Sequence, residues 1–190
     1  MKIDFVSDVS CPWCAIGLRS LETALDRLSP ELQPALRFQP FELNPAMAAG
    51  GQDIAEHLTE KYGLSPEQLA QNSEAIRARG EALGFTFTMG ARRRIYNTFD
   101  AHRLLHWAEL EGRQLPLKQA LFQAYFTDGQ DPSDHDTLVD VAARVGLDPA
   151  RAREVLASGA YADEVRQDER RWQQLGIHAG PGGRTDGGGP

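Results

Sequence analysis

The sequence of 190 residues has only two cysteines, Cys11 and Cys14. Because a structural zinc ion needs four ligands and the chain has no second CxxC or CxxH pair, a zinc site would have to recruit His102 and His106, and we do not expect one. A purely structural disulfide between the two cysteines would close a very short loop and add little stability. The scarcity of cysteine therefore favours a redox role for this pair.

Long hydrophobic stretches and long runs of one charge are also missing. No apolar segment approaches the length of a membrane span. The net charge of −7 is not typical of a protein that binds nucleic acid. The N-terminal segment is too short, and too quickly acidic at Asp4, to be a secretory signal. Unless a leader has been removed, we predict a cytoplasmic protein that binds neither nucleic acid nor a membrane. In that compartment most thiols stay reduced, so a lone CxxC pair is more plausibly catalytic than structural.

The motif Cys11-Pro12-Trp13-Cys14 lies where an apolar run, residues 3–6, gives way to a helical pattern. The first turn of a helix has unpaired backbone N–H groups and the positive end of the helix dipole, so a Cys11 thiolate is stabilised there. Pro12 suits this turn, because its missing N–H would be unpaired in any case. We predict that Cys11 is the solvent-reachable nucleophile and that Cys14 resolves the mixed disulfide by attacking Cys11. Trp13 can shield the disulfide and offer an apolar contact to a peptide substrate.

The first part of the chain has the pattern of a βαβ unit. Residues 2–7 form a short strand pattern, a helical pattern follows Cys11 to about Leu28, and residues 35–43 alternate apolar and polar side chains. Such a crossover favours parallel pairing of the two strands. The rest of the chain, to about Leu175, is a succession of helical patterns bounded by Pro and Gly. The predicted helices span residues 53–62, 66–83, 97–111, 117–126, 134–145, 149–157 and 161–175.

A few other polar side chains could take part in chemistry. Asp8 precedes Cys11 by three residues and could either take part in proton transfer or make a hydrogen bond at the helix entry. His102 and His106 lie four residues apart on one helix face, where packing is a better interpretation than contact with a metal or the dithiol. We interpret the basic cluster at residues 92–94 as a solvated turn rather than an anion site.

Four segments of the sequence resemble the DsbA-like thioredoxin-fold oxidoreductases, in particular their cytoplasmic FrnE-type branch. They are residues 5–14 with the CPWC motif, 38–45 (FQPFELNP), 97–104 (NTFDAHRL) and 121–126 (LFQAYF). The resemblance covers roughly residues 1–178. It implies thiol-disulfide exchange on protein substrates, with Cys11 and Cys14 as the active pair. We expect no bound cofactor or metal, and we expect electron exchange with the thioredoxin or glutathione system, with glutathione as a candidate redox partner.

The fold implied by this resemblance is α/β, a thioredoxin-like domain with a large all-helical insertion. Residues 1–48 would form its N-terminal βαβ part, residues 49–160 the insertion, and residues 161–178 a helix that returns to the thioredoxin-like domain. Family members then continue into a loop whose cis proline faces the CxxC motif, two antiparallel strands and a final helix.

The C-terminal segment of this sequence departs from that pattern. Residues 179–190 are rich in glycine, and we expect a flexible tail in which Pro181 is the one candidate for the cis-proline loop. We therefore expect the C-terminal strands and helix to be missing. A sheet reduced to two strands would leave an uncovered edge, through which the protein could form a homodimer.

Two other functions stay open. The sequence also resembles a related branch, the glutathione-dependent 2-hydroxychromene-2-carboxylate isomerases. That branch shares the implied fold but has a serine where this chain has Cys11. The two thiols of this chain favour disulfide exchange over a glutathione-dependent isomerase or transferase of small molecules. The remaining alternative is a truncated, redox-inactive binding protein.

Overall fold

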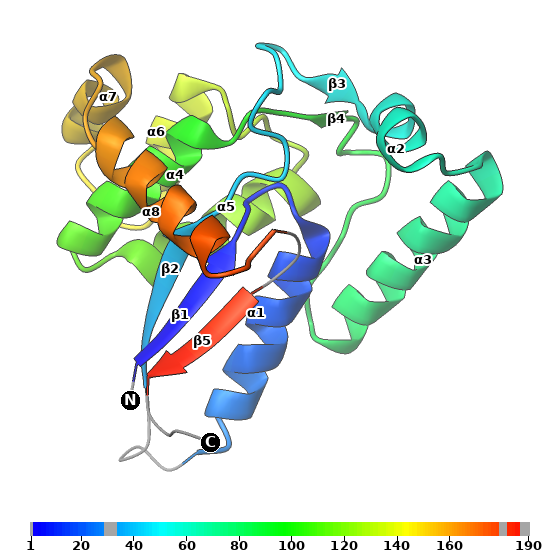
Figure 1. Ribbon diagram of the computed structural model, residues 1–190, viewed down its shortest axis with the longest axis horizontal. Coiled ribbons are helices and arrows are strands. Elements are labelled where there is room, and N and C mark those ends of the chain that lie inside the picture. The colour runs from blue at the N-terminus through cyan, green and yellow to red at the C-terminus, as the bar shows by residue number, and fades with distance from the viewer. Residues whose placement is uncertain (1, 29–33, 179–181, 187–190) are drawn as a thin grey trace.

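The computed structural model describes residues 2–28, 34–178 and, as backbone alone, 182–186 (Figure 1). The first strand, β1 (Lys2–Ser7), pairs in parallel with β2 (Ala35–Pro40). Helix α1 (Pro12–Leu25) connects these two strands. The predicted βαβ unit is therefore confirmed, and the CPWC motif lies at the junction between its first strand and its helix.

A third strand corrects our expectation for the C-terminal segment. We predicted a flexible tail over residues 179–190, but β5 (Gly182–Asp186) pairs antiparallel with β1 and makes the strand order β2-β1-β5. The physical reason is that a strand edge offers unpaired backbone N–H and C=O groups, which a glycine-rich segment can pair with through its backbone alone. No helix follows this strand within the described ranges. Pro181 lies outside the described residues.

The rest of the chain is mainly helical, and its helices begin and end close to the predicted residues. They are α2 (Ile54–Tyr62), α3 (Pro66–Ala82), α4 (Phe99–Leu110), α5 (Gln114–Phe122), the π-helical turn η2 (Gln123–Thr127), α6 (His135–Arg144), α7 (Pro149–Ala157) and α8 (Ala162–Gln174). Side-chain caps explain several starts: Ser65 and Gln68 form a capping box, and Asp134 accepts a hydrogen bond from the Thr137 N–H. The sequence did not predict the small antiparallel pair β3 (Gln52–Asp53) and β4 (Arg94–Ile95).

The helices lie in two groups on either side of α1 and the three-stranded sheet (Figure 1). Helices α2 and α3 with β3 and β4 form one side, and α4 to α7 form the other. Apolar side chains of α4, α5, α6 and α7 share one buried core with Val9. A second core surrounds the two cysteines and consists largely of aromatic rings, among them those of Phe5, Phe38, Phe122, Tyr125 and Phe126. The site thus lies where the βαβ unit meets the helical part.

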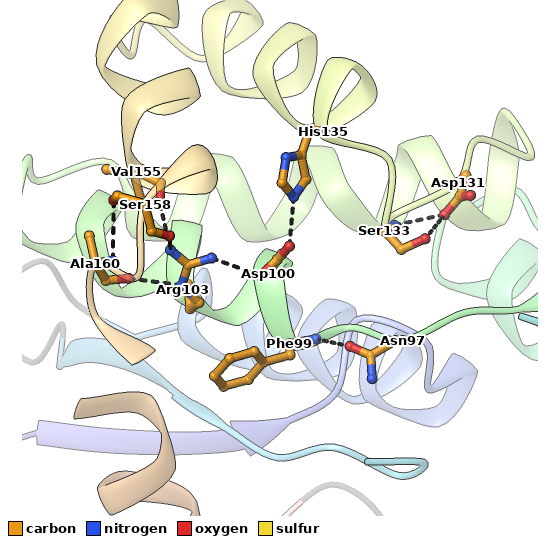
Figure 2. A network of polar contacts seen from close by, with 10 residues as sticks. All are labelled: Asn97, Phe99, Asp100, Arg103, Asp131, Ser133, His135, Val155, Ser158 and Ala160. Atoms are coloured by element: carbon orange, nitrogen blue, oxygen red, sulfur yellow. Dashed lines mark hydrogen bonds and ion pairs between the residues drawn. The ribbon is translucent and has the colours of Figure 1, made fainter. Parts of the chain in front are cut away.

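Buried Arg103 ties the end of α7 to α4 (Figure 2). Its guanidinium donates hydrogen bonds to three backbone carbonyls at and beyond the end of α7, those of Val155, Ser158 and Ala160. It also pairs with Asp100 at 2.8 Å, and Asp100 contacts Nε2 of His135 at 2.6 Å. A cation placed at a helix C-terminus satisfies the last carbonyl groups and complements the helix dipole. None of the helices in the described part of the chain has the length and apolar character of a membrane span.

Candidate active site

Cys11 occupies the N-cap position of α1, directly before Pro12 in the first helical turn. Its backbone is extended (φ −90°, ψ 112°), and its carbonyl accepts the N–H of Cys14 at 3.1 Å and that of Ala15 at 3.3 Å. The side chain of Cys14 therefore lies one turn further into the helix. No acidic side chain lies in the first turn of α1, so the positive end of the helix dipole faces Cys11 without a competing charge there.

The two thiols have opposite electrostatic character. A hydrogen bond from Cys14 lowers the pKa of Cys11, and this outweighs the effect of burial and of the Asp8 charge, which raise it. The same hydrogen bond, together with burial, raises the pKa of Cys14 far above the value of a free thiol. The two cysteines are not joined by a disulfide bond. The arrangement therefore provides one thiolate that can attack and one thiol that holds its proton.

Cys11 reaches its surroundings through a pocket, not through the open surface. Only 4% of Cys11 is exposed. Our expectation that solvent reaches this side chain directly at the protein surface is therefore wrong. The residue lines a mostly apolar pocket of about 390 Å³ with Trp13, Tyr62, Leu58 and Ile76. Of these lining residues, Trp13 and Tyr62 are exposed. The pocket explains how an otherwise buried sulfur can meet a substrate, and Trp13 is placed to contact that substrate.

Asp8 lies buried beneath the helix entry and connects three segments. Its carboxylate accepts hydrogen bonds from the backbone N–H groups of Ser10 (3.3 Å) and Leu43 (2.7 Å). Nε2 of His102 lies 3.5 Å from Oδ1, an ion-pair distance that is long for a hydrogen bond. Burial alone would raise the pKa of Asp8, but His102 and the Leu43 N–H outweigh it and lower the pKa. Asp8 thus keeps a negative charge close to the dithiol, and a helix-entry role and a role in proton transfer are both compatible with this position.

Lys118 is a buried cation that the sequence analysis did not single out. Only 1% of it is exposed, and its Nζ lies 4.9 Å from the ring centroid of Phe122 and 5.9 Å from that of Phe38. Burial lowers the pKa of Lys118 to about 8, against the attraction of Cys14, Asp8 and Cys11, which raises it. In turn the Lys118 charge lowers the pKa of Cys14.

The sequence held a signal for this lysine. The buried face of α5 consists of residues 114, 117, 118, 121 and 122, so the position of Lys118 falls within the helical period of the apolar residues. A charged residue on the buried face of a predicted helix means either that this face has been assigned wrongly or that the buried charge has a function. His106, by contrast, stacks on Tyr161 with ring centroids 5.1 Å apart, in agreement with its interpretation as a packing residue.

Known proteins resemble this chain in sequence and in fold. The sequence profile of the family described as the DSBA-like thioredoxin domain matches residues 2–181. The crystal structure of a probable DsbA oxidoreductase from Streptomyces coelicolor is similar with a TM-score of 0.87 and 38% identity, covering 93% of this chain and 76% of that one. The uncharacterized protein YwbO of Bacillus subtilis is 27% identical over 182 residues, 95% of this chain and 84% of the relative.

A more distant structure shows the fold alone. A 2-hydroxychromene-2-carboxylate isomerase has a TM-score of 0.74 at 14% identity, covering 98% of this chain and 86% of that chain.

In the described part of the present chain, no group of three or more His, Cys, Asp or Glu side chains is arranged to hold a metal ion.

Proposed function

Because the chain belongs to the DsbA-like thioredoxin domain family, we propose that it is a thiol-disulfide oxidoreductase that acts on protein thiols and disulfides through Cys11 and Cys14. The observation that carries this proposal is the asymmetry of the two thiols. Cys11 has a lowered pKa at the N-terminus of α1 and lines a pocket, whereas Cys14 is buried behind it with a raised pKa. A thiolate that can attack next to a thiol that stays protonated is the arrangement that a mixed-disulfide mechanism requires.

In the reducing direction, the Cys11 thiolate attacks one sulfur of a substrate disulfide, and the other substrate sulfur leaves as a thiolate with the electron pair of the broken bond. Cys14 then loses its proton and attacks Sγ of Cys11. This step forms the Cys11–Cys14 disulfide and releases the second substrate thiolate, so two electrons have passed to the substrate. The reverse sequence oxidises a substrate dithiol, and the lowered pKa of Cys11 favours it by stabilising the leaving thiolate.

The buried charges assist the second sulfur. Cys14 must become a thiolate when the internal disulfide opens or when it resolves a mixed disulfide. The positive charge of Lys118 lowers the pKa of Cys14, while the Asp8 charge raises that of Cys11. We infer that Lys118 eases the ionisation of Cys14. The thioredoxin or glutathione system of a reducing compartment would exchange electrons with the enzyme.

Turnover of insulin disulfides with glutathione as the reductant tests the proposal. We expect Cys11→Ser to abolish turnover, and Cys14→Ser to accumulate a mixed disulfide with the substrate that intact-mass analysis detects. The double variant with both substitutions is the matched control and should form no adduct. Equal turnover by the parent and Cys11→Ser would reject the assignment. Glutathione-dependent turnover of a small electrophile that survives Cys14→Ser would support an isomerase or transferase instead.

A further inference from the structure

The pocket beside Cys11 adjoins a second pocket. The second has a volume of about 330 Å³ and extends to Phe87 and Met89. Four residues line both pockets, namely Ile54, Leu58, Ile76 and Arg92. The two pockets therefore adjoin along α2 and α3, and we refer to them together as the groove. Met89 is exposed at its far part, as Trp13 and Tyr62 are near Cys11.

Arg92 and Arg93 both line the second pocket, and Arg92 alone of the two also lines the pocket beside Cys11. Arg92 is half-buried, and its guanidinium carbon lies 5.3 Å from the ring centroid of Tyr125 and 5.1 Å from that of Phe126. The hydroxyl group of Tyr125 donates a hydrogen bond to the backbone carbonyl of Arg94 at 2.9 Å, which fixes this ring beside Arg92. These two rings come from the π-helical turn η2, so a buried element of the core fixes the position of the cation.

Arg92 differs from the two arginines that follow it in the sequence. The guanidinium of Arg94 donates to the backbone carbonyls of Gly50 and Gly51, and Arg93 is exposed, with Nε 3.4 Å from the carbonyl of Gly90. No carboxylate of the described residues lies within ion-pair distance of Arg92. Asp53 is the one acidic side chain among the residues that line the two pockets, and it accepts the N–H of Glu56 as the cap of α2.

A half-buried guanidinium without a counter-ion, next to apolar walls, matches a carboxylate joined to an apolar group. Arg binds carboxylates through paired N–H donors, and such charge-assisted bonds are stronger where water is partly excluded. The groove extends beyond the site of one side chain, because it comprises two adjoining pockets. This length favours an extended peptide over a single small thiol.

We propose that Arg92 recognises an acidic residue of the protein substrate, while the pocket beside Cys11 holds an apolar side chain next to the reacting cysteine. This inference rests on the proposed function and deepens it by naming the substrate class. It also changes our interpretation of residues 92–94, since Arg92 serves as an anion site and Arg93 and Arg94 do not.

Peptide substrates with a neutral leaving group test the proposal. Each peptide has blocked termini and one cysteine, carried as its 2-pyridyl disulfide. Each peptide has Phe next to the cysteine. The peptides form pairs that differ only in having Asp or Asn at one position, and this position varies from pair to pair within four residues of the cysteine on either side. The Cys11 thiolate of a Cys14→Ser protein attacks the peptide sulfur and forms the Cys11–peptide disulfide. The pyridine-2-thiolate leaves with the electron pair of the broken bond and takes up a proton, and its absorbance reports the rate.

We expect at least one Asp peptide to react about tenfold faster than its Asn counterpart, the order of one charge-assisted hydrogen bond. Adding Arg92→Gln should bring this ratio to about one, because the variant has no cation at this position to pair with the Asp carboxylate. Arg92→Lys should keep part of the preference. Arg79→Gln, which removes the same charge from an exposed position of α3, is the matched control and should keep the whole ratio.

The outcomes separate this inference from the proposed function. Equal rates of all Asp and Asn pairs, or a preference that survives Arg92→Gln, would overturn the role of Arg92 while adduct formation still supports the oxidoreductase. No adduct with any peptide would reject the oxidoreductase itself. If only the pyridyl disulfide of glutathione loses rate in Arg92→Gln, the occupant is a small acidic thiol, and the peptide proposal is wrong. If the Arg92→Gln protein does not fold, the salt dependence of the Asp preference in the protein with Arg92 decides the question. A preference that is lost at high salt supports an ion pair, and a preference that persists contradicts it.

Discussion

At the scale of single residues, the site depends on a few buried charges around two sulfur atoms. The CPWC motif predicted the two cysteines and their order, because the helix N-terminus acts locally on the residues beside it. The sequence could not show that Asp8, His102 and Lys118 come together, since these residues lie on β1–α1, α4 and α5 and meet only after folding. The chemistry of the second sulfur therefore comes from tertiary structure.

Removal of the buried cation should slow the step that Cys14 performs. Lys118→Met keeps much of the side-chain volume but removes a charge that lowers the pKa of Cys14. We expect the release of mixed disulfide to slow about tenfold at neutral pH, which corresponds to roughly one pKa unit. Stopped-flow measurement of this step across pH should show its profile displaced to higher pH, a change that a general loss of packing would not cause.

The exposed Lys2→Met variant is the control for net charge. An unchanged pH profile in Lys118→Met would contradict a role for this lysine in the reaction. A change of stability alone would mean that Lys118 acts only in the core.

At the scale of elements, α8 is joined to the segment after β2 through two carboxylates that share one arginine. Arg166 pairs with both Glu42 and Glu169, and its guanidinium lies 3.7 Å from the ring centroid of Phe99. Both glutamates are buried. Burial and the neighbouring Glu169 charge raise the pKa of Glu42 to about 8, against the effect of Arg166. One arginine does not compensate two buried carboxylates, so this junction should respond to pH.

The sign of this response follows from proton linkage. Between the ordinary glutamate pKa of about 4.3 and the folded value of about 8, the folded state binds a proton that the unfolded state has lost. Glu42 therefore reduces the free energy of unfolding progressively as the pH rises through this range. We expect Glu42→Gln to remove this part of the pH dependence.

At pH 8, Glu42→Gln should raise the free energy of unfolding by about 2 kcal/mol after allowance for solvent screening. Urea denaturation at pH 5 and pH 8 measures the effect. Glu154→Gln, which alters an exposed pair with Arg151, should leave the pH dependence as it is. A parent protein whose stability does not fall between these two pH values would contradict the argument.

At the scale of the whole molecule, local patterns predicted most elements, and long-range pairing decided the rest. Proline, glycine and capping residues placed the helices from Ile54 to Gln174 within a few residues, because helix ends depend on local hydrogen bonds. Residues 182–186 have no apolar side chain, so no periodicity could predict that they pair with β1. The strands β3 and β4 are two residues long, too short for a periodic pattern, and their pairing of Gln52 with Ile95 joins distant parts of the chain.

The third strand leads to a prediction about stability. Removal of residues 179–190 should expose the backbone edge of β1 and lower the free energy of unfolding by about 1–3 kcal/mol, the order of a few backbone hydrogen bonds. Hydrogen exchange of the β1 amides and urea denaturation measure this loss, and sedimentation shows whether the free edge now forms dimers. Removal of residues 187–190 alone keeps β5 and serves as the control. Unchanged protection of the β1 amides after the longer truncation would contradict the pairing.

The central claim is that the fold holds Cys11 as a thiolate with the help of Cys14. The rate of iodoacetamide alkylation at each cysteine, followed by mass spectrometry across pH, measures this most directly. We predict that Cys11 reacts with a midpoint below the value of about 8.5 for a free cysteine, that Cys14 does not react over the same range, and that Cys14→Ala moves the Cys11 midpoint upward. A Cys11 midpoint equal to that of a free cysteine, or faster alkylation of Cys14 than of Cys11, would contradict the account.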